Sequence, residues 1–188
     1  MKTQRKANLL VVVLMFFGFS SFSQTKEKTV QVGGAPMYPS KNIVENAVNS
    51  KDHTTLVAAV KAAELVETLQ SDGPFTVFAP TNTAFDKLPK GTVEFLVKPE
   101  NIKTLQTILT YHVLAGKFSE DAIKAAIKEN KGTADFKTVS GGKLKAMLKG
   151  KDIILIDENG GQAKVTISNV NQSNGVIHVI DTVVIPKS

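Results

Sequence analysis

A short strand-like segment inside a helical region constrains the fold of this chain more than any other feature. The segment GPFTVFAPTNTAF, residues 73–85, runs from a Gly-Pro turn through aromatic and β-branched residues to a helix start at Thr81 or Asn82. The residues on either side of it are predicted helices. Since a strand needs a hydrogen-bonding partner, we expect Phe75, Val77 and Phe78 to join strands from the end of the chain.

Apolar periodicity predicts helices over much of the region from residue 40 to residue 130. They are expected to start at Ser40, at Asp52 or Thr54, near Pro99 and after Ser119. From residue 136 onward, strand-like runs are separated by turn sequences such as Ser-Gly-Gly and Glu-Asn-Gly-Gly. A helical first half and an antiparallel second half predict an α+β fold.

The N-terminus has the pattern of a secretory signal peptide. A basic head precedes an apolar run at residues 9–19 and small residues before a cleavage point after Ser23. We therefore predict a signal peptide at 1–23, a flexible leader at 24–39 and one domain at 40–188. The apolar run is shorter than the roughly 20 residues of a membrane-spanning helix, so no stable membrane span is expected. The predicted location is secreted, either periplasmic or extracellular.

The composition argues against several classes of function. Without the signal peptide the chain has 20 basic and 17 acidic residues, and it contains no Trp and two Tyr. Nucleic-acid-binding proteins cluster basic residues with stacking aromatic side chains, whereas these lysines are dispersed, so no nucleic-acid partner is expected. The chain has no cysteine, which excludes disulfides and thiolate chemistry.

Candidate catalytic and metal-binding residues are few. His53, His112 and His178 lie far apart in the sequence and lack the short spacings of zinc sites. No G-x-S-x-G motif is present, and the paired glycines do not open helices as a phosphate-binding loop would. We expect no metal, no cofactor and no enzymatic activity, and we expect His112 and His178 to be buried.

Three segments together resemble the signature segments of fasciclin domains. They are GPFTVFAPTNTAF at 73–85, ILTYHVLAGKF at 108–118 and NGVIHVIDTVVIP at 174–186. The resemblance covers about residues 40–186. It implies a β-wedge of about seven mainly antiparallel strands wrapped by several helices, in secreted or surface proteins linked to adhesion and without a shared enzymatic role. The signature positions are Thr76, Phe78, Pro80, Thr81, Asn82, Phe85, Asn174, Gly175 and His178.

The resemblance also implies an adhesive segment. In animal matrix proteins with this domain, a Tyr-His pair and its aliphatic neighbours have been proposed as an integrin contact. The matching residues are Tyr111 and His112, flanked by Ile108, Leu109, Val113 and Leu114. The apolar neighbours of Tyr111 and His112 favour a structural role for this pair over a binding role. A second proposed contact corresponds to residues 168–171, where Asn169 replaces the expected aspartate and cannot supply a carboxylate to a cation.

Two functions from different classes follow from these observations. The first is a secreted adhesion module whose partner is a protein or polysaccharide on a cell surface or matrix. The alternative is a carrier that holds an apolar small molecule or lipid between the helices and the sheet, as the aliphatic stripes suggest. The sequence leaves the oligomeric state open.

Overall fold

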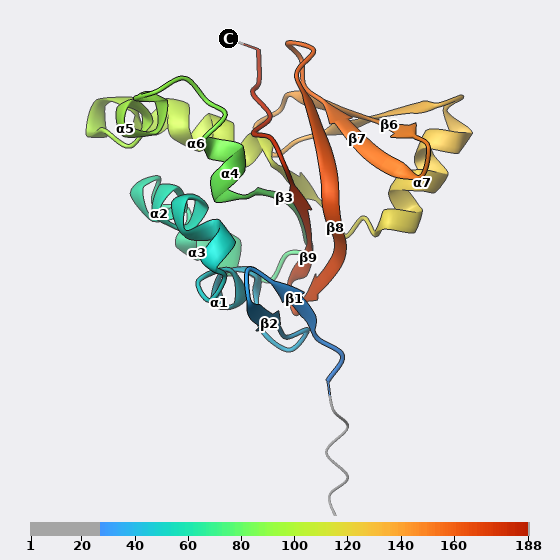
Figure 1. Ribbon diagram of the computed structural model, residues 1–188, viewed down its shortest axis with the longest axis horizontal. Coiled ribbons are helices and arrows are strands. Elements are labelled where there is room, and N and C mark those ends of the chain that lie inside the picture. Colours follow the sequence, from blue (N-terminus) through green and yellow to red (C-terminus); the bar gives the residue numbers. More distant parts are fainter. Residues whose placement is uncertain (1–26, 188) are drawn as a thin grey trace, which may run out of the picture.

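The computed structural model describes residues 27–187 (Figure 1). The predicted signal peptide and the first three residues of the predicted leader lie outside this range. In chain order, the elements are β1 (Val30–Val32), β2 (Ala35–Met37), α1 (Ile43–Ala47), η1 (Lys51–His53), α2 (Thr54–Ala62), α3 (Val66–Gln70), β3 (Phe75–Pro80), α4 (Asn82–Phe85), α5 (Thr92–Leu96), η2 (Pro99–Asn101), α6 (Ile102–Tyr111), β4 (Val113–Ala115), α7 (Glu120–Glu129), β5 (Thr133–Lys137), β6 (Lys143–Lys149), β7 (Asp152–Ile156), β8 (Gln162–Gln172) and β9 (Gly175–Ile180).

A seven-stranded sheet organises the fold, with strand order β4-β3-β9-β8-β7-β6-β5. β3 and β9 are parallel, and the other neighbouring pairs are antiparallel. Helices α1 to α6 lie on one side of β3 and β9, whereas α7 packs on the opposite side, near β5 and β6 (Figure 1). The predicted α+β fold with about seven mainly antiparallel strands is confirmed.

The early strand joins the late strands as the sequence predicts. β3 lies between β4 and β9, and its pairing with β9 starts with Phe75 opposite Gly175. The N–H of Phe75 donates to the carbonyl of Asn174 at 3.0 Å, and the N–H of Phe78 donates to the carbonyl of His112 at 2.9 Å. This single strand therefore ties the helical half of the chain to the sheet.

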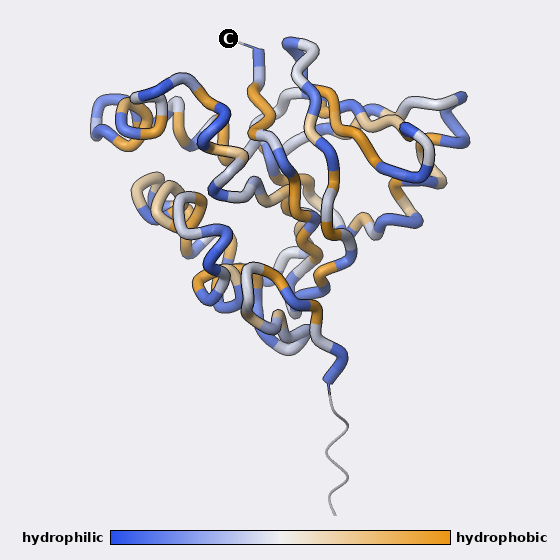
Figure 2. The backbone as a smooth tube through the Cα atoms, in the orientation of Figure 1, coloured by the Kyte–Doolittle hydropathy of each residue, from blue (hydrophilic) through white to orange (hydrophobic). Residues whose placement is uncertain are grey.

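Two hydrophobic cores lie on the two faces of the sheet. The helical-side core contains Val77 and Ala79 of β3 together with buried residues of α1, α2 and α6. The strand-side core contains Phe78 of β3 and the buried residues of α7 and β5 to β7. Because successive side chains of a strand point to opposite faces, β3 contributes to both cores. The strongly hydrophobic stretches of β3, β7 and β9 lie inside the molecule, while hydrophilic residues occupy the turns (Figure 2).

The predicted flexible leader is wrong for residues 30–37, which form the hairpin of β1 and β2. Gly33 and Gly34 make its turn, with φ values of 58° and 77°. A two-residue hairpin turn of this kind needs positive φ at both positions, which glycine adopts freely. Val32 and Met37 are 4% and 3% exposed, so burial of apolar side chains anchors the hairpin. Two such residues are too few to give a hydrophobic period in the sequence.

Helix starts follow local capping rules with one correction. Thr81 and Ser119 cap α4 and α7, as predicted, by accepting from backbone N–H groups. Ser40 does not cap α1. Asn42 takes that position and forms a capping box with Glu45, which satisfies two helix-end donors reciprocally. Within residues 27–187, no helix is long and apolar enough to cross a membrane.

Candidate functional site

The Tyr-His segment lies at the junction of a helix and the first strand of the sheet. The apolar face of α6 buries Leu105 and Leu109, and the helix ends at Tyr111. His112 is the C-terminal cap, after which β4 pairs with β3. Leu109 and Val113 belong to the helical-side core, whereas Tyr111 and Leu114 belong to the strand-side core. The segment thus alternates between the two cores.

Tyr111 is fully buried and holds two parts of the sheet with its hydroxyl group. The Oη atom donates to the carbonyl of Lys143 at 2.6 Å and accepts from the N–H of Glu158 at 3.3 Å. Burial raises the pKa of Tyr111 to about 12. Gly142 leaves room for the ring, because a Cβ at that position would lie 2.9 Å from its Cε2 atom.

His112 is 3% exposed and uses both of its ring nitrogens. Nδ1 pairs with the carbonyl of Ile108 at 2.8 Å and must donate to it, because a carbonyl only accepts. Nε2 accepts from the N–H of Val184 at 3.2 Å. This arrangement fits the neutral ring. Burial lowers the pKa of His112 to about 4, although the bond to Ile108 opposes the shift.

These positions limit the adhesive contact that the resemblance implies. Five of its six residues are buried, and Ile108 is half-buried. A partner touching the folded surface would therefore meet Ile108 and not the aromatic pair. The physical reason is the one that the sequence already indicated, namely that an apolar segment beside a strand is stabilised by burial. In this structure, Tyr111 and His112 are packing and hydrogen-bonding residues.

Asn169, in the second predicted adhesive segment, also has a structural position. Its φ is +57°, at an irregularity in the pairing of β8 with β9. Asparagine adopts this left-handed conformation more readily than most residues. Its Oδ1 atom accepts from the N–H of Glu120 at 2.8 Å, and its own N–H donates to Nδ1 of His178 at 3.3 Å. Asn169 therefore links the start of α7 to the sheet.

His178 is fully buried on β9. Its Nε2 pairs with the carbonyl of Phe118 at 2.8 Å, and its ring stacks on Phe78 with centroids 5.7 Å apart. Burial lowers the pKa of His178. With Nδ1 accepting from Asn169, the ring has two partners as a neutral group, which is a structural arrangement.

The side chain of Asn174, another signature residue, makes three hydrogen bonds. Its Oδ1 accepts from the N–H of Ile43 at 3.0 Å, and its Nδ2 donates to the carbonyls of Leu69 and Ser71 at 2.8 and 2.9 Å. These bonds fix α1 and the end of α3 to the turn between β8 and β9. At Gly175, a Cβ would lie 2.1 Å from the carbonyl oxygen of Phe75, so the close approach of β3 requires glycine.

The remaining signature residues surround the ends of β3. Thr76 Oγ1 donates to the carbonyl of Gly116 at 2.7 Å and accepts from the N–H of Phe118 at 2.8 Å. Asn82 Oδ1 accepts from the N–H of Thr55 at 3.0 Å, and its Nδ2 donates to the carbonyl of Lys51 at 2.9 Å. The other three positions are Pro80, which is buried at the end of β3, Thr81, which caps α4, and Phe85, which packs on the helical-side core.

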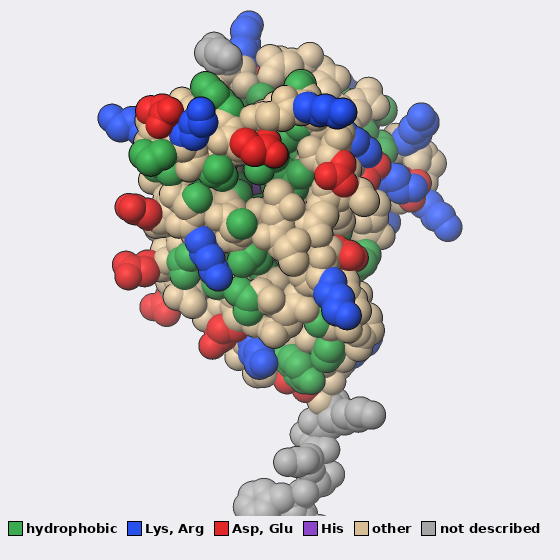
Figure 3. Space-filling model, turned by 60° about the vertical axis from the view of Figure 1, so that its left-hand side comes forward, with side chains coloured by type: hydrophobic (Ala, Val, Ile, Leu, Met, Phe, Trp, Pro, Cys, Tyr) green, Lys and Arg blue, Asp and Glu red, His purple; other side chains and the backbone are tan. Residues whose placement is uncertain are grey.

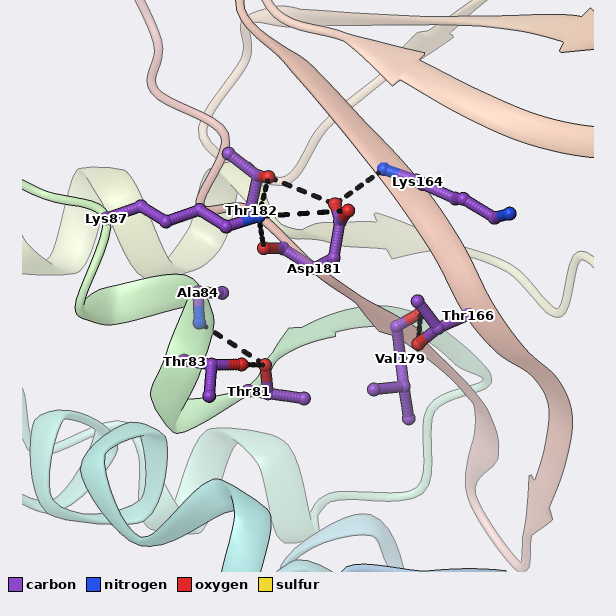
Figure 4. A network of polar contacts seen from close by, with 9 residues as sticks. All are labelled: Thr81, Thr83, Ala84, Lys87, Lys164, Thr166, Val179, Asp181 and Thr182. Atoms are coloured by element: carbon purple, nitrogen blue, oxygen red, sulfur yellow. Dashed lines mark hydrogen bonds and ion pairs between the residues drawn. The ribbon is translucent and has the colours of Figure 1, made fainter.

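A polar network on the surface joins α4 to the end of β9 (Figure 4). Asp181 accepts from the N–H of Lys164 at 2.8 Å and from Oγ1 of Thr182 at 3.0 Å. Lys87 donates to the carbonyl of Asp181 at 2.6 Å, while its ion pair with the carboxylate spans 3.8 Å. These groups are well exposed, so the ion pair adds little stability. Acidic and basic side chains are interspersed on this helical side of the molecule (Figure 3).

The three histidines do not form a metal site. Each histidine bonds to different partners, and residues 27–187 hold no group of three or more His, Asp or Glu side chains placed to bind a metal ion. The structure also contains an apolar cavity of ≈ 90 Å³ between α1 to α3 and the sheet, whose lining residues the sequence did not identify. Val77, Ala79 and Ile177 line its sheet side, and His53 and His112 also border it. The aliphatic stripes of the helices were the one signal that pointed to it.

Comparisons with known proteins agree with the geometry. The fasciclin domain family matches residues 51–186. Protein sll1483 of Synechocystis sp. is 44% identical over 164 residues, which cover 87% of this chain and 83% of that relative. Immunogenic protein MPB70 of Mycobacterium bovis is 36% identical and matches 74% of this chain and 66% of its own length.

Two further matches bear on location and fold. Cell surface glycolipoprotein MPB83 of Mycobacterium bovis is 35% identical, with 74% of this chain and 58% of that relative covered. The solved structure of a FAS1 domain pair from the insect cell adhesion molecule fasciclin I aligns with a TM-score of 0.68 at 15% identity, over 84% of this chain and 57% of that one. At that identity the likeness concerns the fold alone. On the extent of the family match and the identity of its relatives, this chain belongs to the fasciclin domain family.

Proposed function

We propose that this protein is a secreted, non-enzymatic interaction module that attaches to a protein or polysaccharide on a cell surface or in a matrix. The observation that carries the proposal is membership of a family with a relative described as a cell surface glycolipoprotein. The hydrogen bonds of Tyr111, His112 and His178 support it, since each of these buried side chains bonds to groups of the fold.

The burial of Tyr111 and His112 directs attention to other surfaces. The exposed side chains of β5 and β6 include Lys137, Lys143 and Lys145, with Asp135 among them. Lys143 lies across from Lys137, and Lys145 lies across from Asp135. The ion pair between Lys143 and Asp135 spans 3.8 Å, with side chains 72% and 49% exposed, so solvent screens it and the lysines stay available. Such a face suits an anionic polymer or an acidic protein surface.

An attachment assay with charge-reversal variants tests the proposal. Purified protein is allowed to bind cells or isolated matrix from its source, and the Lys143→Glu, Lys145→Glu double variant is compared with the parent. We expect the double variant to attach several-fold less and the parent to lose attachment as salt rises, because screening weakens contacts between exposed charges. Removing surface protein with protease, or glycans with glycosidases, identifies the class of partner.

A matched control comes from the helical side. The Lys98→Glu, Lys103→Glu variant makes the same change in net charge at two exposed residues next to and within α6. We expect it to attach like the parent. Attachment that equals the background of an unrelated protein of similar charge would overturn the proposed function. Equal loss in both variants would overturn the assignment of the contact to β5 and β6.

A further inference from the structure

The apolar cavity is placed where a small molecule could be held inside the folded domain. Its helix side includes Ile43, Leu56 and Leu69, and its sheet side includes Val77 and Ala79. Its volume of ≈ 90 Å³ is smaller than the cavity of about 150 Å³ that holds a benzene ring. The cavity is thus tighter than one that holds benzene. It can take a small ring or the end of an apolar chain if its lining adjusts slightly.

One buried polar atom at this cavity lacks a partner. His53 is 3% exposed, and among the described residues nothing stands in hydrogen-bond geometry to its Nε2 atom. Buried polar groups are nearly always paired, so this exception calls for a cause. The carbonyl of Ala79 acts on the ring and raises its pKa against the lowering by burial, which is the larger effect. That carbonyl nevertheless does not meet the geometry of a hydrogen bond, and Nε2 keeps its capacity for another partner.

The other nitrogen of His53 determines what Nε2 can offer. Nδ1 lies 2.8 Å from Oγ of Ser50, which is itself buried and has no other hydrogen-bond partner in the described part of the chain. If the Ser50 hydroxyl donates to Nδ1, the ring proton is on Nε2 and one group is left unpaired. The opposite direction leaves two groups unpaired, the hydroxyl proton and Nε2. The first arrangement costs less, so Nε2 carries a proton and is a free donor.

Water does not fit this vacancy well. A buried water molecule needs two to four polar partners. Two of the other polar residues at the cavity are already paired, since His112 bonds to Ile108 and Val184, and Thr110 bonds to Gln106. Lys61 and Thr68 also line the cavity, but their side chains are exposed at its outer edge. A water molecule beside His53 would keep one hydrogen bond and lose the rest. A ligand whose only polar group is one acceptor oxygen leaves none of its own hydrogen-bonding groups unpaired in the cavity.

We propose that this cavity binds a neutral apolar molecule, or the end of one, whose single hydroxyl, carbonyl or ether oxygen accepts the Nε2 proton of His53. The apolar part contacts the aliphatic wall between the helices and β3. The site is separate from the lysine-bearing face of β5 and β6 and does not depend on the proposed attachment.

Two probes of matched shape test the donor. Cyclopentanone and cyclopentane differ by one carbonyl oxygen, and binding of each to the full chain is followed by NMR titration, with the imidazole nitrogens observed directly. We expect cyclopentanone, but not cyclopentane, to shift the Nε2 resonance of His53. In the His53→Leu variant we expect cyclopentanone to bind about fivefold more weakly, as the loss of one neutral hydrogen bond implies, while cyclopentane binds as before.

A second variant tests the location. Ala79→Val places two further methyl groups in the cavity wall at a strand position where a β-branched residue is well accommodated. Binding of both probes should fall at least fivefold, with thermal unfolding used to confirm that the variant is folded. Failure of both probes to bind the parent up to their solubility would overturn the proposal. So would equal affinity of cyclopentanone for the parent and His53→Leu, or binding that Ala79→Val leaves unchanged.

Discussion

Acidification should reveal whether His112 is buried in the working protein. The neutral ring donates through Nδ1 to Ile108 and accepts through Nε2 from Val184, so protonation would remove the acceptor and place a charge in the interior. Burial lowers the pKa of His112 from 6.5 to about 4. The perturbation is therefore a fall in pH, compared between the parent and a His112→Gln variant that cannot titrate.

The sign and size of the effect follow from linkage. Because the folded pKa lies below the unfolded one, the unfolded chain binds the proton first as the pH falls. The stabilisation is fully present above pH 6.5 and is lost progressively between pH 6.5 and about 4. Between pH 7.5 and 4.5, pKa values of 6.5 and about 4 give a loss of about 2.5 kcal/mol from this group alone.

Urea unfolding at the two pH values measures this loss. We expect the parent to lose about 2.5 kcal/mol more than His112→Gln, since the other titrating groups contribute equally to both proteins. Glutamine keeps one amide donor and one acceptor, which limits its cost at neutral pH. If the two proteins lose stability in parallel, the imidazole is accessible to solvent in the folded state. The Tyr-His segment would then be free to contact a partner, and our structural assignment would be refuted.

Three further substitutions, and Asn171→Ala as a control, test the contacts between elements of the fold by urea unfolding. Gly175→Ala should destabilise the protein by about 3 kcal/mol or more, because the new Cβ would lie 2.1 Å from the Phe75 carbonyl oxygen. A loss below about 1 kcal/mol would contradict the close approach of β3 and β9. Asn174→Ala should cost about 3 kcal/mol through three lost hydrogen bonds, whereas Asn171→Ala, with one weak bond at the surface, should cost less than about 1 kcal/mol. Ser119→Ala should cost about 1 kcal/mol as a lost cap of α7, and no loss would show that the cap is dispensable.

Local patterns predicted the elements that depend on local physics. The start of α7 at Ser119 and of α4 at Thr81 follow from capping, which involves residues within one turn. The insertion of β3 among the late strands was predictable because an isolated strand needs partners and the rest of the first half is helical. The parallel pairing of β3 with β9 could not be predicted, because strand content alone does not determine strand direction.

The features that escaped prediction depend on contacts distant in sequence. The hairpin of β1 and β2 is fixed by burial of Val32 and Met37 in a core whose other members come from the rest of the chain. The α1 cap is at Asn42, two residues after the predicted Ser40, because Asn42 can form a capping box with Glu45. The cavity beside His53 exists because side chains from several elements leave a space unfilled. The aliphatic stripes of the helices suggested an apolar site between helices and sheet, but they could not show which residues line it.

The sheet order allows the two proposed sites to be separated. The cavity lies beside β3, whereas the lysine-bearing face is on β5 and β6, at the other end of the order β4-β3-β9-β8-β7-β6-β5. Energetic effects of substitutions that share no contact usually add. Ala79→Val should therefore leave attachment unchanged, and the Lys143→Glu, Lys145→Glu variant should bind cyclopentanone like the parent. Loss of attachment on filling the cavity would instead mean that the two sites are coupled, with β9, β8 and β7 as the physical connection between them.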